Sequence, residues 1–158
     1  MSKDIEITEV NGWHCAATFS SSDIGSERVL LELSKNFGAT WPRVALEVEA
    51  SRSPITALRV AGPHEIDEKI EGSQGFEYAR GIKSSCVGAI VRGMSFGLEG
   101  SSGVDLHVAT GGVAAETSPK ICEFAAEAAT RVLLGRMSGL APLAGVLDEL
   151  SRTWVERR

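Results

Sequence analysis

The first twenty residues alternate between hydrophobic and polar positions. Residues 4–10 place Ile5 and Ile7 on one side of an extended chain, and residues 13–19 alternate in the same way. Asn11-Gly12 lies between the two segments, and this dipeptide is typical of the tight type I′ turn of a hairpin. The pattern predicts a β-hairpin with Trp13 and Phe19 directed into the core.

The next apolar pattern has the spacing of a helix. Val29, Leu30, Leu33 and Phe37 recur at intervals of one to four residues, which places them along one stripe of a helix. Gly38 follows, at the position where a left-handed residue ends many helices. We therefore expect a helix over residues 29–37, after a turn rich in serine at residues 20–23.

Two strands and a loop are predicted next. After Pro42, residues 43–49 alternate between apolar and charged side chains, as in a strand with one buried face. A second strand is expected over residues 55–61, after Pro54. Residues 62–75 are polar, acidic and bounded by glycine, which predicts a long loop.

Residues 76–98 fit two structures. Apolar positions from Tyr78 to Ile90 suit a helix, but four glycines in this segment each disfavour a helix interior by roughly 1 kcal/mol. The same residues also fit a pair of strands. The helix, ending near residue 92 and followed by irregular structure, is the favoured interpretation, and its glycines would let another backbone approach closely.

The last third of the chain predicts one strand and two helices. Residues 104–109 alternate as a strand, and Thr110-Gly111-Gly112 is expected to end it in a turn. Ser118-Pro119 has the composition of a helix start, with serine as the N-cap and proline at the first helical position. A final helix is expected after Pro142, with its apolar stripe running from Leu143 to Trp154.

These elements predict one domain over residues 1–158. Their order is β-β-α-β-β-(α)-β-α-α, and the fold class is α+β or α/β. A single mixed sheet of about five strands is expected, packed by two to four helices. The length of 158 residues suits one hydrophobic core.

Charge and composition narrow the classes of function. The net charge is −5 and the sequence pI is about 5.3, so the chain is acidic and lacks the clustered basic residues of a nucleic-acid or anionic-membrane binder. Cys15, Cys86 and Cys122 are odd in number and widely spaced, which favours a reducing compartment. With no apolar leader pattern at its start, we expect a cytoplasmic protein.

The sharpest candidate for chemistry is the segment 108–119. A strand that ends in glycines before a helix N-terminus can hold an anion on free backbone N–H groups, which makes Thr110, Gly111, Gly112 and Ser118 candidate ligand-binding residues. An ordinary turn explains the same glycines. His107 and Asp105 share one face of the preceding strand and are candidate partners in this site, although a solvated strand face is the favoured explanation of both.

No catalytic or metal-binding constellation is predicted. Cys86 has no base predicted beside it, and the three histidines lack the spacing of zinc ligands. We therefore expect no cofactor and no metal, and whether the chain is an enzyme stays open at this point.

Two functions fit the sequence. The favoured one is a non-enzymatic binding or assembly subunit of a soluble cytoplasmic complex, with a protein partner or a second copy of the chain, and with Trp41 and Trp154 as candidate anchors. The alternative is a small enzyme or ligand-binding domain with an anion site at residues 108–119. Neither nucleic acid nor membrane is expected as a partner.

Overall fold

The computed structural model describes seven segments of the chain: residues 3–21, 26–35, 43–60, 65–71, 77–114, 117–138 and 143–156. For Lys3 and for residues 65–71, 77, 79–80 and 153–156 it describes the backbone alone. The strands are β1 (Lys3–Val10), β2 (Trp13–Ser21), β3 (Glu27–Lys35), β4 (Arg43–Arg52), β5 (Ala57–Val60), β6 (Glu65–Glu71), β7 (Glu77–Gly81) and β8 (Val104–Val113). The helices are the short 3-10 turn η1 (Ser84–Cys86), α1 (Val87–Gly97), α2 (Pro119–Met137) and α3 (Leu143–Glu156).

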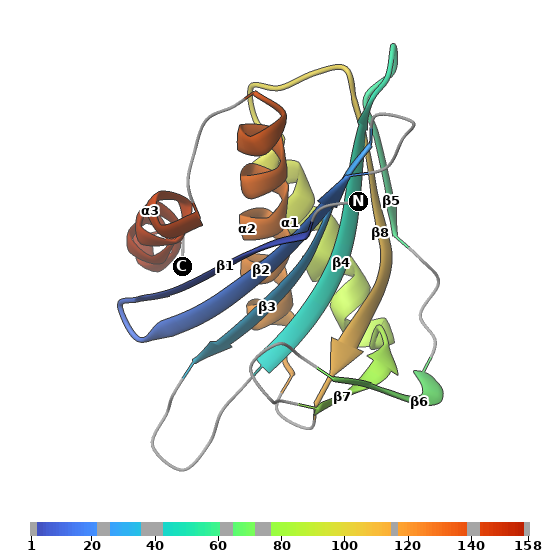
Figure 1. Cartoon of the computed structure of the whole chain (residues 1–158), viewed down its shortest axis with the longest axis vertical. Coiled ribbons are helices and arrows are strands. Elements are labelled where there is room, and N and C mark those ends of the chain that lie inside the picture. The colour runs from blue at the N-terminus through green and yellow to red at the C-terminus, as the bar shows by residue number, and fades with distance from the viewer. Residues whose placement is uncertain are drawn as a thin grey trace.

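One mixed sheet and one layer of helices make up the described fold. Eight strands form the sheet in the order β1-β2-β3-β4-β8-β7-β6, and β5 pairs with β8 in parallel beside this path. All other pairings are antiparallel. The three helices lie on the same side of the sheet (Figure 1). The predicted class, a single mixed sheet with helices packed on it, is confirmed.

The predicted hairpin forms at the start of the chain. Asn11 and Gly12 have φ values of 52° and 83°, the positive values that a type I′ turn needs. β1 and β2 pair along their whole length, from Val10 opposite Trp13 onward. Trp13 and Phe19 are buried on the helix side, as predicted, and the Trp13 ring stacks on Phe124 of α2 with centroids 4.4 Å apart.

The helix predicted over residues 29–37 is wrong, because this segment is strand β3 up to Lys35. Every second side chain of β3 points into the core, namely Val29, Leu31 and Leu33. The strand pairs with β2 on one side and with β4 on the other. Leu30, which completed the helical stripe, lies half-buried on the opposite face. The remaining predicted helix residues, 36 and 37, lie outside the described part of the chain.

Two further predictions need correction in the middle of the chain. The segment expected as a loop, residues 62–75, contains strand β6, whose charged and apolar residues pair with β7. Within residues 76–98 the helix begins only at Val87, because Glu77–Gly81 forms strand β7 first, and it runs to Gly97, past the expected end near residue 92. Gly81 has φ 138°, a value that favours glycine, and the chain turns there from β7 toward α1.

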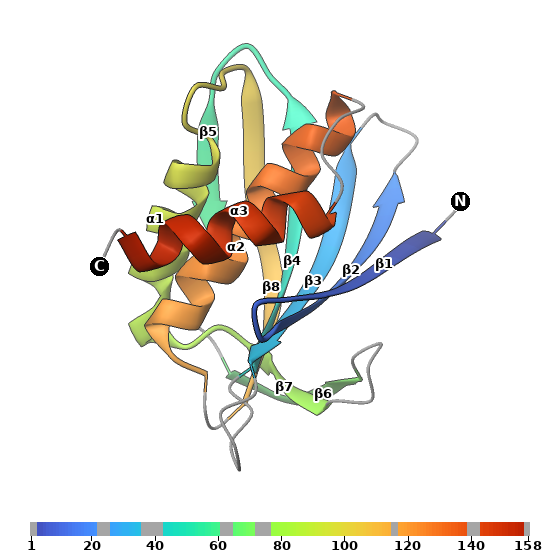
Figure 2. The same cartoon turned by 90° about the vertical axis from the view of Figure 1, so that its left-hand side faces the viewer.

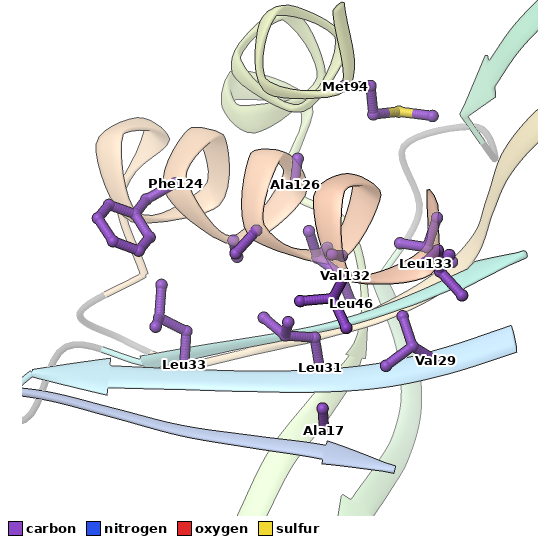
Figure 3. Close-up of a cluster of buried hydrophobic side chains, with 14 of the residues drawn as sticks. Ala17, Val29, Leu31, Leu33, Leu46, Met94, Phe124, Ala126, Val132 and Leu133 are labelled. Carbon is purple, nitrogen blue, oxygen red and sulfur yellow. The ribbon is translucent and has the colours of Figure 1, made fainter. Parts of the chain in front are cut away.

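The core lies between the sheet and the helices, with α2 at its centre. Side chains of β3 and β4 point toward α2, and Phe124, Val132 and Leu133 of that helix point back at them (Figure 3). α1 packs beside α2 at the distance that glycine allows: a Cβ on Gly93 would lie 2.3 Å from the Glu123 carbonyl oxygen. The expected close backbone approach is therefore made by α1 against α2. α3 lies across the outside of α2 (Figure 2).

The helix predictions near the C-terminus hold. Ser118 is the N-cap of α2 and Pro119 is its first residue, and the Ser118 hydroxyl accepts a hydrogen bond from the Ile121 N–H at 3.4 Å. Among the described residues, no helix combines the length and the hydrophobicity needed to cross a membrane.

Candidate functional site

The face of the sheet that points away from the helices carries most of the predicted site residues. We call it the open face. Asp105 and His107 of β8 both lie on it, because their neighbours Val104, Leu106 and Val108 are buried on the helix side. A β-bulge then shifts the register of β8 against β4 between Glu47 and Val48.

The bulge decides which residues join Asp105 and His107. Val48 is opposite Val108 and Glu47 is opposite Thr110, so Ala109 is the extra residue. Without this insertion Thr110 would point into the helix layer. With it, Thr110 and Gly112 lie on the open face, in line with Asp105 and His107.

The turn predicted at Thr110-Gly111-Gly112 is wrong. β8 continues through these residues to Val113, pairing Thr110, Gly111 and Gly112 with Glu47, Leu46 and Ala45 of β4. The backbone of these residues is therefore part of a ladder, and Arg80 of β7 pairs with Gly112 from the other side. The anion site considered from the sequence needs free backbone N–H groups at a turn. Residues 110–112 form a strand instead, so the reason for expecting an anion there does not apply.

The two glycines instead make room for β7. A Cβ on Gly112 would lie 2.5 Å from the Tyr78 Cβ of β7, and a Cβ on Gly111 would lie 3.2 Å from the Gly81 carbonyl oxygen at the end of β7. Contacts shorter than 3 Å do not occur between such atoms, so only glycine lets Tyr78 lie against the sheet at Gly112. The two glycines therefore mark the close approach of another strand, β7, where the sequence predicted a turn.

Ser118 is not brought to the open face. It caps α2, which packs on the other side of the sheet. Six residues of strand, about 20 Å, separate His107 from Val113 at the end of β8 nearest α2. The six predicted site residues therefore split. Asp105, His107, Thr110 and Gly112 share the open face, Gly111 faces the helix side opposite Leu46, and Ser118 lies apart from them all.

Asp105 is engaged by an arginine rather than by His107. The Arg59 guanidinium of β5 donates to both carboxylate oxygens, through Nε at 3.3 Å and through a terminal nitrogen at 2.9 Å. His107 stands directly between Glu49 and Arg59 in the strand register, and no hydrogen bond joins it to Asp105 in the described structure. The arrangement is a row of alternating charges, not an acid/base pair.

A second arginine extends this row across the sheet. Arg28 of β3 donates to Glu49 from Nε at 3.1 Å and from a terminal nitrogen at 2.5 Å, and its other terminal nitrogen lies 3.2 Å from Glu47. The hydrogen bond to Glu49 is the largest of the effects that raise the pKa of Arg28. Two arginines here face three carboxylates, so this part of the open face offers no excess positive charge to attract an anion.

A buried polar cluster at one end of the open face was not predicted. Glu32 and Ser34 of β3 are both 4 % exposed, and Tyr78 of β7 is 2 % exposed. Arg43 lies over the Tyr78 ring, 5.8 Å from its centroid. Burial first, and then the charge of Glu32, raise the pKa of Tyr78 above its usual range. The helix predicted over residues 29–37 leaves Glu32 off its apolar stripe. The sequence therefore offered no reason to expect Glu32 in a buried cluster.

The cysteines are buried in the core rather than exposed as nucleophiles. Cys86 and Cys122 are each 1 % exposed and are both part of the core, Cys86 at the end of η1 and Cys122 in the first turn of α2. Burial is the main cause that raises the pKa of Cys122 above its usual range, and Lys83 opposes it. A thiol that stays protonated is a poor nucleophile, so this pair is part of the packing.

Strand β1 is the feature of the open face that the sequence did not single out. It lies at the outer edge of the sheet, with β2 on one side and no strand on the other among the described residues (Figure 2). Ile5 and Ile7 point to the open face and are 55 % and 62 % exposed. The even-numbered residues point the other way, into the helix layer: Asp4 accepts a short hydrogen bond from Arg136, and Glu6 accepts one from the Leu143 N–H at 3.2 Å.

Comparisons with known proteins add no relative. No protein-family model, no curated protein and no solved structure matches this chain. Among the described residues, no group of three or more His, Cys, Asp or Glu side chains is arranged to hold a metal ion.

Proposed function

We propose that this chain is a non-enzymatic assembly subunit that binds an extended segment of protein as an added strand alongside β1. One observation carries the proposal: β1 is a long, regular edge strand that pairs with β2 over all eight of its residues without a bulge. A strand of this kind presents a row of unpaired N–H and C=O groups to solvent. Such edges are the surfaces on which proteins bind extended peptides by strand addition.

The register of the hairpin identifies the outward groups. In a two-residue turn the flanking residues, Val10 and Trp13, form a hydrogen-bonded pair, and hydrogen-bonded pairs then alternate along an antiparallel ladder. Asp4, Glu6, Thr8 and Val10 therefore use their backbone groups on β2. The odd-numbered residues Lys3, Ile5, Ile7 and Glu9 direct theirs outward.

The strands at the two ends of the strand order differ in a way that supports this choice. β6, at the other end of the strand order, is interrupted by an irregular register between Glu65 and Lys69, and five of its seven residues are charged. Irregularity and charge are common protections of an edge. β1 has neither a bulge nor a proline, and it exposes two isoleucines on the open face. We take the partner to be a segment with apolar residues at alternate positions.

The groups on the rest of the open face support binding rather than catalysis. Asp105, Glu47 and Glu49 are each paired with an arginine, so they are poor candidates for proton transfer. Trp41 and Trp154, the anchors considered from the sequence, lie outside the side chains that the structure describes. β1 therefore replaces them as the candidate interface.

A labelled peptide with the sequence of residues 3–10 tests the proposal as a probe strand. We expect it to bind the chain in fluorescence anisotropy, and a peptide of the same composition without the alternation to bind at least about tenfold more weakly, a difference of roughly 1.4 kcal/mol.

Two variants of the chain separate edge binding from nonspecific contact. Ile7→Pro removes an outward N–H and leaves the β1–β2 ladder intact, so it should abolish peptide binding while the fold persists by circular dichroism. Ile55→Lys changes an isoleucine that is 74 % exposed away from β1 and should leave binding unchanged. Equal binding to wild-type and Ile7→Pro chains would contradict the proposal.

A further inference from the structure

We infer that the strand added to β1 is β1 of a second copy of this chain, related to the first by a two-fold axis at Glu6. This inference rests on the proposed function and names its partner. The resulting dimer has one continuous sheet, in which two antiparallel β1 strands form the junction and the two helix layers lie on the same side.

Only some registers use the outward backbone groups of both copies. In an antiparallel pair, residues that direct their N–H and C=O groups toward each other must stand opposite one another. The outward residues of β1 are the odd-numbered ones, from Lys3 to Glu9, so odd must face odd. A two-fold axis at Glu6 brings all four of these residues into pairs with the same four residues of the second copy.

This register also pairs side chains that fit each other. Ile5 stands opposite Ile7 of the second copy, and the reverse pair follows from the symmetry, so four exposed isoleucines meet on the open face. At the ends of the junction the lysine position 3 stands opposite Glu9 of the second copy. Opposite charges at paired positions stabilise an antiparallel ladder.

The neighbouring registers fit less well. An axis at Ile7 places Ile5 opposite Glu9, and an axis at Ile5 places Ile7 opposite position 3, a lysine. Each of these registers sets an isoleucine against a charged residue and pairs only three of the four outward residues of β1. The register centred on Glu6 is the one in which both the charges and the apolar side chains of β1 are matched.

Glu6 is the one residue that meets its own copy at the axis. Two carboxylates at a paired position repel, but Glu6 already accepts a hydrogen bond from the Leu143 N–H at 3.2 Å, and Arg136 lies 3.9 Å from its other oxygen. Asp4, also bound to Arg136, is the other acidic group on this face of β1. We therefore expect Glu6→Gln, which keeps an acceptor for Leu143, to tighten the dimer several-fold.

A cross-linking experiment reads the register directly. Glu6→Cys places two thiols opposite each other in a non-hydrogen-bonded pair, whose Cα atoms are about 4.5 Å apart and within reach of a disulfide. With oxidised glutathione as the oxidant, which is reduced to two thiols for each disulfide formed, we expect a covalent dimer on a non-reducing gel. The native cysteines are buried and do not compete.

Matched cysteine variants serve as controls for the register. Asp4→Cys or Thr8→Cys alone should not cross-link, because each residue lies about 13 Å, four residues of strand, from its own copy. A mixture of these two variants should cross-link, since position 4 stands opposite position 8. Cross-linking of Asp4→Cys alone, or none by Glu6→Cys in a sample that is dimeric, would overturn the register.

Sedimentation velocity over a range of concentrations separates this inference from the proposed function. We expect a monomer–dimer equilibrium for the wild-type and Ile55→Lys chains, and a monomer for Ile7→Pro. A wild-type chain that remains monomeric at millimolar concentration but still binds the residue 3–10 peptide would overturn the inference and leave the proposed function standing. A dimer that persists in Ile7→Pro would overturn the inference, because β1 would then not be its junction. Peptide binding that also persists in Ile7→Pro would overturn both.

Discussion

At the scale of single residues, three buried groups must stay uncharged in the folded chain. Burial, aided by the charge of Glu32, raises the pKa of the Cys15 thiol to about 12. Burial also raises the pKa of Cys122 and of Tyr78 above their usual ranges. In the unfolded chain these groups ionise at ordinary values, about 8.5 for a thiol and about 10 for a phenol.

This difference predicts how stability depends on alkaline pH. The pKa values are raised in the folded state, so the stability from the neutral groups is complete below about pH 8 and is lost as the pH rises from about 9 toward 12. The loss is roughly 1.4 kcal/mol per pH unit for each group that ionises only in the unfolded chain. Urea unfolding between pH 7 and pH 11 measures it. Cys15→Ala should give a shallower decline, and a flat profile for the wild-type chain would contradict the burial of these groups.

Gly112 gives a second prediction at this scale. Gly112→Ala should destabilise the chain by about 1–3 kcal/mol, because the added Cβ would lie 2.5 Å from the Cβ of Tyr78. Thr110→Ala, two positions away on the same face, is the control and should change stability much less. In the Tyr78→Gly background, which removes the Cβ of residue 78, the cost of Gly112→Ala should largely disappear. An additive double-mutant cycle, measured by urea unfolding, would show that the two residues do not meet.

At the scale of elements, the close packing of α1 on α2 makes two glycines of one helix respond in opposite directions. A Cβ on Gly93 would lie 2.3 Å from the Glu123 carbonyl oxygen, whereas the nearest atom to a Cβ on Gly88 would be in the Arg92 side chain at 3.8 Å. Gly93→Ala should therefore cost about 1–3 kcal/mol or more. Gly88→Ala should stabilise the chain by about 0.5–1 kcal/mol through helix propensity. Thermal unfolding of both variants measures this, and a loss of equal size from each would contradict the packing.

The elements that the sequence predicted correctly are those with a local signal. Asn11-Gly12 specifies a turn by its backbone conformation, and Ser118-Pro119 specifies a helix start by the same kind of local chemistry. Strand β4 was predicted because one of its faces is buried and the other is partly wet, so its alternation is clear. Each of these features can be recognised without knowing what packs on it.

Strand β3 was predicted wrongly because its burial is not local. It lies in the middle of the sheet, and at its end both faces are covered, since Leu31 and Leu33 face the helices while Glu32 and Ser34 are buried on the other side. Burial on both faces weakens the period-two pattern, and Leu30 then completes a helical stripe by coincidence. Contacts between segments far apart in the sequence also explain Gly111 and Gly112. These glycines mark the approach of β7 and do not form a turn.

At the scale of the whole molecule, the sheet has two unlike faces, and the strands at the two ends of its strand order are unlike as well. The helices cover one face, and on the open face ion pairs join the acidic side chains of β4 and β8 to arginines of β3 and β5. The β1 edge alone combines an unbroken outward backbone with exposed isoleucines in the described structure. The sequence showed the alternation of Ile5 and Ile7, but it could not show that β1 lies at an edge, since strand order is set by long-range pairing.

The size of the interface predicts its strength. Two strands of eight residues bury less surface than the roughly 1,200–2,000 Å² of a stable specific complex, so we expect a weak and reversible dimer. Apolar contact should contribute to it, because each isoleucine gains up to about 1.5–3 kcal/mol on full burial. The dissociation constant from sedimentation equilibrium should therefore rise with Ile5→Thr, which keeps the strand and removes apolar surface. Unchanged affinity in that variant would mean that the isoleucines do not meet.

Residue-resolved amide hydrogen exchange of β1 tests the central claim, assembly through this edge, most directly. At low concentration the outward amides of Ile5, Ile7 and Glu9 should exchange quickly, while those of Glu6 and Thr8 are protected by β2. At high concentration the outward amides should become protected as well, and this gain should be absent for Ile5 and Glu9 in Ile7→Pro. Outward amides that exchange equally fast at every concentration, or protection that appears on the exposed surface of α1 instead, would contradict the account.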